Sequence, residues 1–371
     1  MEKELLYRLA LTRVAGIGPV YAKKLFRHFG AAAAIFQAGP MALDKAGLPD
    51  KLIPALLSPP DLAALEKEQL LLHRQEIRTL FFADPDYPQR LLPYEDAPVF
   101  LFYKGNANLN SPKILAIVGT RQPTEYGRQM TAMLIRDLSQ AIPGLVIISG
   151  LALGIDGAAH RAALAGNLPT IGVLGHGFPH VYPSEHAGLV RKMENQGGLL
   201  TEFPYDTRPQ TYQFPLRNRV IAGMIDALIV IETALQGGSL GAVEMALEYR
   251  KNIFAVPGRI HDGKSAGCNR LIREGKARLL TDTQQLITAM NWETTARATT
   301  QPSLFPPSLP GLQEPENTLI GLLQGKENVS LDELADKTSL DIPSIAVALL
   351  NLELRGAITT LPGKRYRLKN E

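Results

Sequence analysis

The chain has 371 residues, 45% of them hydrophobic and 20% charged, and a formal net charge of +3. This length predicts two or three domains, and the near-neutral charge gives no general argument for nucleic-acid binding. The single cysteine, Cys268, excludes an intrachain disulfide and a multi-cysteine metal site. No signal-peptide core is evident, and no apolar run approaches the roughly 20 residues of a membrane span. We therefore expect a soluble cytoplasmic protein with no membrane span.

Residues 1–75 have the apolar spacing of short helices, for example at Leu5, Leu6 and Leu9. The glycine turn at Gly16–Pro19 separates two such helices and resembles a helix-hairpin-helix. The sequence therefore predicts a helical domain of the helix-hairpin-helix or SAM-like kind over residues 1–75. Its turn amides could bind a nucleic-acid backbone, or the module could have a purely structural or protein-binding role.

Residues 76–290 alternate apolar strands with helices. Two short strands flank a proline-marked segment, and fully apolar strands follow; we expect strands at 79–82, 99–103, 114–118, 145–149, 170–174, 199–202, 226–232 and 252–256. Apolar strands that alternate with helices are typical of a doubly wound parallel sheet covered on both faces. Ligands of such sheets bind beyond the carboxyl ends of the strands, where the glycine-rich turns of this chain fall.

The first candidate site follows the strand at 114–118, where Gly119, Thr120 and Arg121 precede a helix. Free amides and the positive end of a helix favour an anion, and the guanidinium fork of Arg121 suits phosphate oxygens. The turn is not a G-x-G-x-x-G fingerprint and no acidic residue follows at the expected distance, so we expect no NAD.

The second candidate site is the segment containing Phe214, Arg217, Asn218 and Arg219. An aromatic ring three residues before two arginines fits a binder of phosphates and bases, because single-strand binding combines stacking with guanidinium–phosphate contacts. The alternative is a helix N-terminus with solvated arginines. We favour the binding role.

A third candidate is the turn that contains Gly238 and Ser239, which opens a helix and offers amides and a hydroxyl to a phosphate.

Asp156 and His160, one helical turn apart, could act as an acid/base pair or could tie the helix to a neighbouring loop, and we favour the structural tie. The chain has no G-x-S-x-G or Walker A motif. We expect no catalytic residues, no metal and no cofactor.

Residues 291–315 are rich in Thr, Pro, Ser and Gln, which predicts a linker. Residues 316–371 form a compact unit with a first helix at 318–323. Ser330 to Glu333 reads as a capping box that opens a second helix, and Pro343 begins a third. Residues 357–368 read as a hairpin with a Pro-Gly turn. Three helices and a hairpin predict a winged helix.

Taken in order, the motifs closely resemble the DprA/Smf family of bacterial DNA-processing proteins. The matching segments are IVGTRQPTEYG, SGLALGIDGAAH, VYPSEH, TEFP, FPLRNRVIAG, GGSLGAVEMAL, AVPGRI and GCNRLIREGKA. They span about residues 85–285. The resemblance implies an extended Rossmann-like fold over residues 76–290 that binds single-stranded DNA in its pocket. It implies a recombination mediator that protects incoming DNA and loads the RecA recombinase during natural transformation.

Motif by motif, the resemblance assigns the DNA pocket to nine residues: Gly119, Thr120, Arg121, Phe214, Arg217, Asn218, Arg219, Gly238 and Ser239. The family forms homodimers through the late part of the fold, where Leu271 and Leu279 are the apolar candidates. The competing hypothesis is a nucleoside-monophosphate hydrolase of a related Rossmann fold, which would need Arg121 or Arg217 beside Glu232 or Glu244. A transcription regulator, suggested by the winged helix alone, is a third reading.

Overall fold

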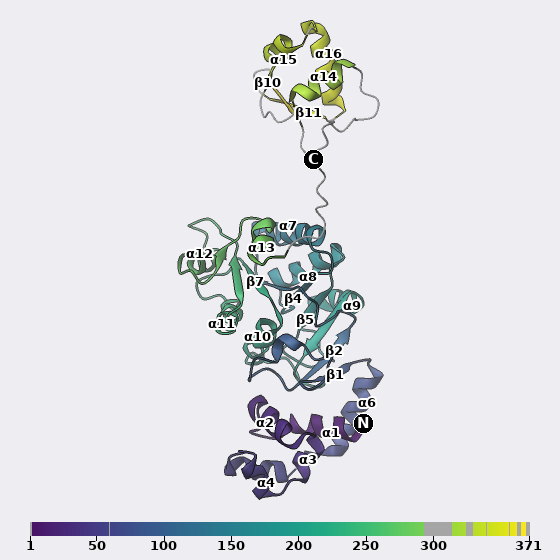
Figure 1. The fold of residues 1–371 in the computed structure, drawn as a ribbon, viewed down its shortest axis with the longest axis vertical. Coiled ribbons are helices and arrows are strands. Elements are labelled where there is room, and N and C mark those ends of the chain that lie inside the picture. The colour runs from purple at the N-terminus through teal and green to yellow at the C-terminus, as the bar shows by residue number, and fades with distance from the viewer. Residues whose placement is uncertain are drawn as a thin grey trace. The chain divides into compact units, whose positions relative to one another are not determined.

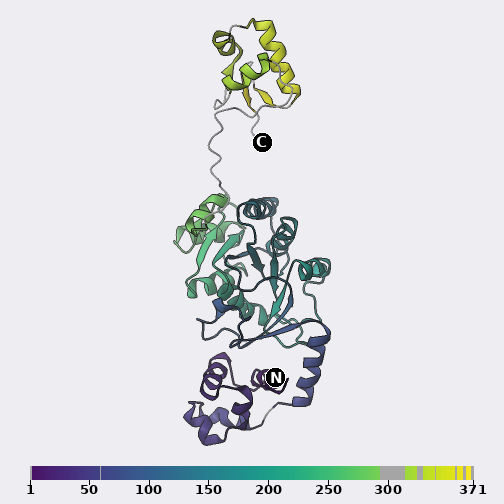
Figure 2. The ribbon, with the colours of Figure 1, turned by 45° about the vertical axis from the view of Figure 1, so that its right-hand side comes forward.

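The computed structural model describes residues 2–58, 60–292, 314–323, 329–338, 340–355, 357–361 and 365–368. The chain divides into two compact units, residues 1–294 and residues 295–371, and each is considered by itself (Figures 1 and 2). In the described part of the chain, no helix combines the length and the apolar character needed to cross a bilayer.

The first unit begins with a helical segment, as the sequence predicts. Its helices are α1 (Glu2–Leu11), α2 (Pro19–Phe29), α3 (Ala32–Gln37), α4 (Pro40–Lys45), α5 (Ile53–Leu57) and α6 (Leu62–Arg74). The Gly16–Pro19 turn joins α1 to α2; whether it binds a nucleic-acid backbone stays a prediction. The segment is tied to the remainder of the unit, because Arg8 pairs with Asp84 at 2.8 Å and Lys23 donates to the Tyr94 carbonyl at 2.9 Å.

The remainder of the first unit is built on one nine-stranded sheet in the order β1-β2-β6-β5-β4-β3-β7-β8-β9. The strands are β1 (Arg78–Phe81), β2 (Phe100–Gly105), β3 (Ile114–Gly119), β4 (Val146–Ser149), β5 (Thr170–Val173), β6 (Gly197–Thr201), β7 (Ala227–Ile231), β8 (Asn252–Ala255) and β9 (Arg278–Leu279). Strands β3 to β9 pair in parallel, whereas β1 and β2 extend the sheet antiparallel beyond β6. All eight predicted strands are confirmed. Strand β9 is absent from the predicted strands, because its two residues form no apolar run.

Both faces of the sheet are covered, and β3 shows how. Ile114, Ala116 and Val118 contribute to one apolar cluster, whereas Leu115 and Ile117 contribute to another, because successive strand residues point to opposite faces. The helices of this part are α7 (Glu125–Ala141), α8 (Ile155–Ala165), α9 (Ala187–Asn195), α10 (Gln213–Met224), α11 (Leu240–Glu248), α12 (Ala266–Arg273) and α13 (Thr283–Ala289). Helices α7, α8 and α13 pack on one face and α10 and α11 on the other (Figure 1). The doubly wound parallel sheet is confirmed.

The second unit consists of α14 (Glu314–Leu323), β10 (Val329–Ser330), α15 (Leu331–Lys337), α16 (Ile342–Leu354), β11 (Ile358–Leu361) and β12 (Arg365–Leu368). The Ser330 hydroxyl accepts from the Glu333 amide at 3.2 Å and caps α15, as predicted. Strand β12 pairs antiparallel with β10 and with β11. Three helices and a small antiparallel sheet in this order form the predicted winged helix.

The division into domains at 1–75, 76–290, 291–315 and 316–371 stays a prediction. Most of the predicted linker, residues 293–313, and the predicted Pro-Gly turn at 362–363 lie outside the described residues. Trp292, at the start of the predicted linker, is 7% exposed and packs in the apolar cluster beneath α7 and α13. The ordered core of the first unit therefore extends to Trp292.

Gly119 at the end of β3 has no room for a side chain. A Cβ there would lie 1.9 Å from the Ile231 carbonyl oxygen on β7. We expect Gly119→Ala to lower the free energy of unfolding by about 3 kcal/mol, because backbone has to move. Urea unfolding followed by the fluorescence of Trp292, the single tryptophan, measures this.

The matched control is Gly188→Ala in α9, where no atom lies within 4 Å of the added Cβ. We expect this change to be neutral or to stabilise by about 0.5 kcal/mol, since alanine favours a helix over glycine. Equal stability of the two variants would contradict the close approach of β3 and β7.

Candidate functional site

A cavity of about 500 Å³ lies at the carboxyl ends of β3 and β7. Strand β3 stands where the strand order reverses, with β4 on one side and β7 on the other, and doubly wound sheets bind ligands at such a point. The cavity is lined by all the predicted site residues except Arg219: Gly119, Thr120, Arg121, Phe214, Arg217, Asn218, Gly238 and Ser239. Segments that lie up to 120 residues apart in sequence order thus meet in one place.

The loop after β3 is clamped from two sides. The Thr120 amide donates to the Glu232 carbonyl at 2.7 Å, and the Thr120 carbonyl accepts from the Ile155 amide of α8 at 3.1 Å. Gly154 has φ 82°, and a Cβ there would lie 2.2 Å from the Thr120 carbonyl oxygen. Gly154 is not among the predicted site residues, although it stands in the SGLALGIDGAAH motif. The loop is held closely, while Arg121 at its end is exposed.

Arg217 supplies a buried positive charge at the cavity wall. Its side chain donates from Nη1 to the Val173 carbonyl at 2.5 Å and packs on Gly150, where a Cβ would lie 2.3 Å from Nη1. No acceptor for its buried Nε lies in the part of the chain that the structure describes. Burial lowers the pKa of Arg217 to about 10; Asp156 raises that pKa and Arg121 lowers it further. The guanidinium is therefore charged at neutral pH and incompletely bonded.

Asp156 holds the turn between β4 and α8. Its carboxylate accepts from the Gly150 amide at 3.1 Å and the Ala152 amide at 3.4 Å, and burial raises its pKa while Arg217 opposes that shift. His160 lies fully buried, with Nδ1 2.7 Å from the Thr170 hydroxyl. These contacts agree with the structural tie that we favoured over an acid/base pair.

The aromatic part of the site is a pair of rings. Phe214 stacks on Tyr182 with ring centroids 5.5 Å apart and planes at 28°. Phe214, Arg217 and Asn218 lie three and four residues apart on α10 and therefore share one helical face. Tyr182 is not among the predicted site residues, although it stands in the VYPSEH motif. Tyr182 is 48% exposed and can offer a ring to a ligand.

The start of α11 faces the cavity with backbone rather than with a hydroxyl. The Ser239 hydroxyl donates to the Thr233 hydroxyl at 2.7 Å, so a direct phosphate contact by this hydroxyl is not what the structure shows. In the first turn of α11 the Leu240 amide donates to the Gly237 carbonyl at 3.0 Å and the Ala242 amide to the Ser239 carbonyl at 3.1 Å. Gly238 keeps the approach to the positive end of this helix open, because no atom lies within 4 Å of its Cβ position.

Arg219 does not reach the cavity. Its guanidinium donates to the Asp96 carbonyl and forms an ion pair with Glu202. The prediction grouped Arg217 and Arg219 by their proximity in sequence, but residues two apart on a helix point about 200° apart. Arg219 joins α10 to neighbouring loops.

The hydrolase hypothesis needed a glutamate beside Arg121 or Arg217. Glu232 is buried and accepts from the Thr124 amide at 2.8 Å and from the Thr124 hydroxyl, at the start of α7. Glu244 is exposed on α11, and neither glutamate lines the cavity. The described residues also contain no group of three or more His, Cys, Asp or Glu that could hold a metal.

Of the two dimer candidates, Leu271 is 3% exposed and packs in the core of its own unit, so it offers no surface for a partner. Leu271 lies on the face of α12 that packs against the core, and the presence of one leucine in the sequence does not show which face of the helix it occupies. Leu279 on the edge strand β9 is 48% exposed.

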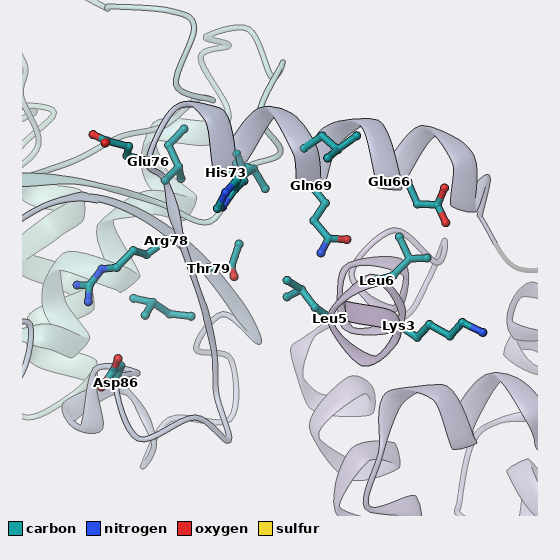
Figure 3. Close-up of a pocket in the computed structure, with 14 residues that line it drawn as sticks. Lys3, Leu5, Leu6, Glu66, Gln69, His73, Glu76, Arg78, Thr79 and Asp86 are labelled. Carbon is teal, nitrogen blue, oxygen red and sulfur yellow. The ribbon is translucent and has the colours of Figure 1, made fainter. Parts of the chain in front are cut away.

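A larger cavity, about 1100 Å³, lies between α1, α6 and β1 (Figure 3). Its charged lining residues are Glu66, Glu76 and Asp86 against Lys3 and Arg78. The carboxylates outnumber the cations, so this cavity does not suit a polyanion.

The comparisons with known proteins agree with this geometry. The family model described as DNA recombination-mediator protein A matches residues 78–291, and the model of the DprA winged helix domain matches residues 303–364. The chain belongs to the DprA/Smf family. It is 31% identical to protein Smf of Synechocystis, across 97% of this chain and 98% of that protein, and 36% identical to protein Smf of Escherichia coli, across 76% and 75%.

Two solved structures of DprA share the fold. DprA from Streptococcus pneumoniae matches with a TM-score of 0.66 and 34% identity, across 76% of this chain and 97% of that chain. DprA from Helicobacter pylori, whose structure is described as showing a unique single-stranded DNA binding mode, matches with a TM-score of 0.53 and 30% identity. That match covers 58% of this chain and 96% of the other.

His160 makes stability sensitive to acid. Burial lowers the pKa of His160 from 6.5 to about 3. The folded-state pKa lies below the unfolded value, so stability is complete above pH 6.5 and is lost as pH falls towards 3. We expect wild type to lose about 2 kcal/mol more than His160→Gln between pH 7 and pH 5, measured by urea unfolding with Trp292 fluorescence. Parallel pH profiles would contradict a neutral, buried His160.

Proposed function

We propose that this protein binds single-stranded DNA in the cavity at the carboxyl ends of β3 and β7. The observation that carries the proposal is the buried guanidinium of Arg217, whose Nε lacks an acceptor among the described residues, in a cavity that Arg121 also lines. A phosphate there would supply the missing acceptor and a compensating negative charge. The single-stranded DNA binding described for Helicobacter pylori DprA, which has the same fold, supports it.

The proposed contacts divide between backbone and base. Arg121, Arg217 and the positive end of α11 would bind phosphates, and the exposed ring of Tyr182 together with the half-buried ring of Phe214 would stack on bases. None of these groups reads a base edge, so binding would show little sequence preference and strong dependence on salt.

The finer function is that of a recombination mediator, the role that the matched family description names. In this proposal the protein protects incoming single strands, loads RecA onto them in the cytoplasm during natural transformation, and performs no catalytic step of its own. Faster RecA filament assembly on single strands in the presence of this protein would support loading, and unchanged assembly would contradict it.

Arg121→Ala tests the cavity. Arg121 is exposed, so its removal should spare the fold, unlike truncation of the buried Arg217. We expect affinity for a labelled single-stranded oligonucleotide to fall about tenfold through the loss of a charge-assisted hydrogen bond. The slope of log K against log salt should fall by about 0.7 in magnitude. Fluorescence anisotropy over a salt series measures both.

Arg136→Ala on α7 is the matched control, because it removes the same charge from a side chain that is 67% exposed and pairs with the adjacent Asp137. It should leave both quantities unchanged. If the two variants weaken binding equally, the contribution is diffuse charge and the proposed cavity site is wrong.

We also propose that the protein forms a homodimer through the edge of the sheet at β9. Leu279 is an exposed apolar side chain on a strand that pairs on one side only, with β8.

We expect Leu279→Glu to convert dimer to monomer in sedimentation velocity, since a buried unpaired carboxylate opposes association. Met41→Glu, at a residue 76% exposed on α4, serves as the control and should leave the dimer intact. If the Leu279→Glu variant is still a dimer, the proposed interface at β9 is wrong.

A further inference from the structure

The loop of residues 202–212 connects β6 to α10 and delivers residues to the cavity. Thr211 at its end lines the cavity, and Phe214 follows in the first turn of α10. Tyr212 between them is 62% exposed. The path of this loop therefore determines where the aromatic side of the site stands.

The middle of the loop is held by a residue from the helical segment. The Tyr205 amide donates to the Glu68 carboxylate of α6 at 3.0 Å. Arg13, in the chain between α1 and α2, donates to both oxygens of the same carboxylate at 3.0 and 3.1 Å. The Arg13 and Glu68 side chains are only 19% and 16% exposed, so the contact is largely shielded from water. Both bonds come from the Nη2 atom of Arg13, and a part-buried pair of this kind fixes its geometry more firmly than a surface ion pair.

The opposite side of the loop is held just as closely. The Gly177 amide donates to the Thr207 carbonyl at 2.8 Å, and a Cβ at Gly177 would lie 1.8 Å from the Tyr205 carbonyl oxygen. The Thr207 amide in turn donates to the Pro204 carbonyl at 3.1 Å. The turn at residues 204–207 is thus enclosed between Glu68 and Gly177, with little freedom to shift unless one of them is removed.

We propose that Glu68 is a positioning residue for DNA binding: the helical segment uses its carboxylate to hold the loop that places Thr211, Tyr212 and Phe214 at the cavity. Glu68 itself does not line the cavity and touches no ligand there. The inference rests on the proposed function of that site. Under this proposal the helical segment contributes to the DNA affinity of the cavity even if its Gly16–Pro19 turn makes no contact with DNA.

The test compares two substitutions at Glu68 in the full chain. Glu68→Ala removes the acceptor, so we expect affinity for the single-stranded oligonucleotide to fall about tenfold, the cost of ordering the loop on binding. Hydrogen exchange in peptides covering residues 203–210 should accelerate. Glu68→Gln retains an oxygen that can accept from the Tyr205 amide, so affinity and protection should return to within about twofold of wild type.

The control is Glu66→Ala on the same helix. Glu66 lies about 200° around α6 from Glu68 and lines the cavity between α1, α6 and β1 (Figure 3). It should change neither affinity nor exchange in residues 203–210. Unfolding followed by Trp292 fluorescence reports global stability, which we expect to change little in any of the three variants.

The possible results separate the proposed function of the cavity from the proposed role of Glu68. A wild type that binds no single-stranded DNA overturns the proposed function. Wild-type binding that Arg121→Ala weakens and Glu68→Ala leaves unchanged overturns the role of Glu68 alone. Equal losses of affinity and of global stability in Glu68→Ala and Glu68→Gln would also overturn it, because they would show a general structural role.

Discussion

The guanidinium of Arg217, buried against Gly150 at the carboxyl ends of the strands, is the feature on which the site depends. Removing a cation from water is unfavourable unless hydrogen bonds and an opposite charge replace the lost hydration. Here the Val173 carbonyl bonds one nitrogen, and Asp156 supplies charge while also bonding the turn at Gly150. These contacts do not fully replace the lost hydration, because the Nε group of Arg217 has no acceptor among the described residues. An anion in the cavity is the physical complement of that arrangement.

The close approaches of backbone around this cation explain the glycine-rich motifs. A side chain at Gly150 would collide with the guanidinium, one at Gly119 with β7, and one at Gly154 with the Thr120 carbonyl. Each glycine therefore lets two segments approach more closely than any other residue allows. The result is a narrow cavity whose polar groups converge from β3, α8, α10 and α11, which explains how a chain of net charge +3 can offer a locally cationic site.

The helical segment and the sheet form one unit, and specific polar contacts connect them. Lys23 bonds the Tyr94 carbonyl, Arg8 pairs with Asp84, and Glu68 bonds the Tyr205 amide. Arg219, which the motif suggested as a DNA contact, bonds Asp96 and Glu202 instead and joins α10 to neighbouring loops. Residues adjacent in sequence on α10 thus serve different purposes: Arg217 and Asn218 face the cavity, and Arg219 secures loops at the side.

The sequence by itself determined the parallel sheet and the winged helix, and it predicted the edge of the sheet at which the cavity lies. Apolar runs that end in glycine turns predict strands whose carboxyl ends meet at one edge, and that geometry follows from local pattern alone. Only the tertiary structure decided which side chains reach the cavity. Arg219 and the Ser239 hydroxyl are directed elsewhere, Leu271 packs in the core instead of at the surface, and Tyr182 stacks on Phe214. The direction of a side chain depends on helix register and on partners that lie from 6 residues (Thr233 for Ser239) to 123 residues (Asp96 for Arg219) away in the chain. Those partners come together only when the chain has folded.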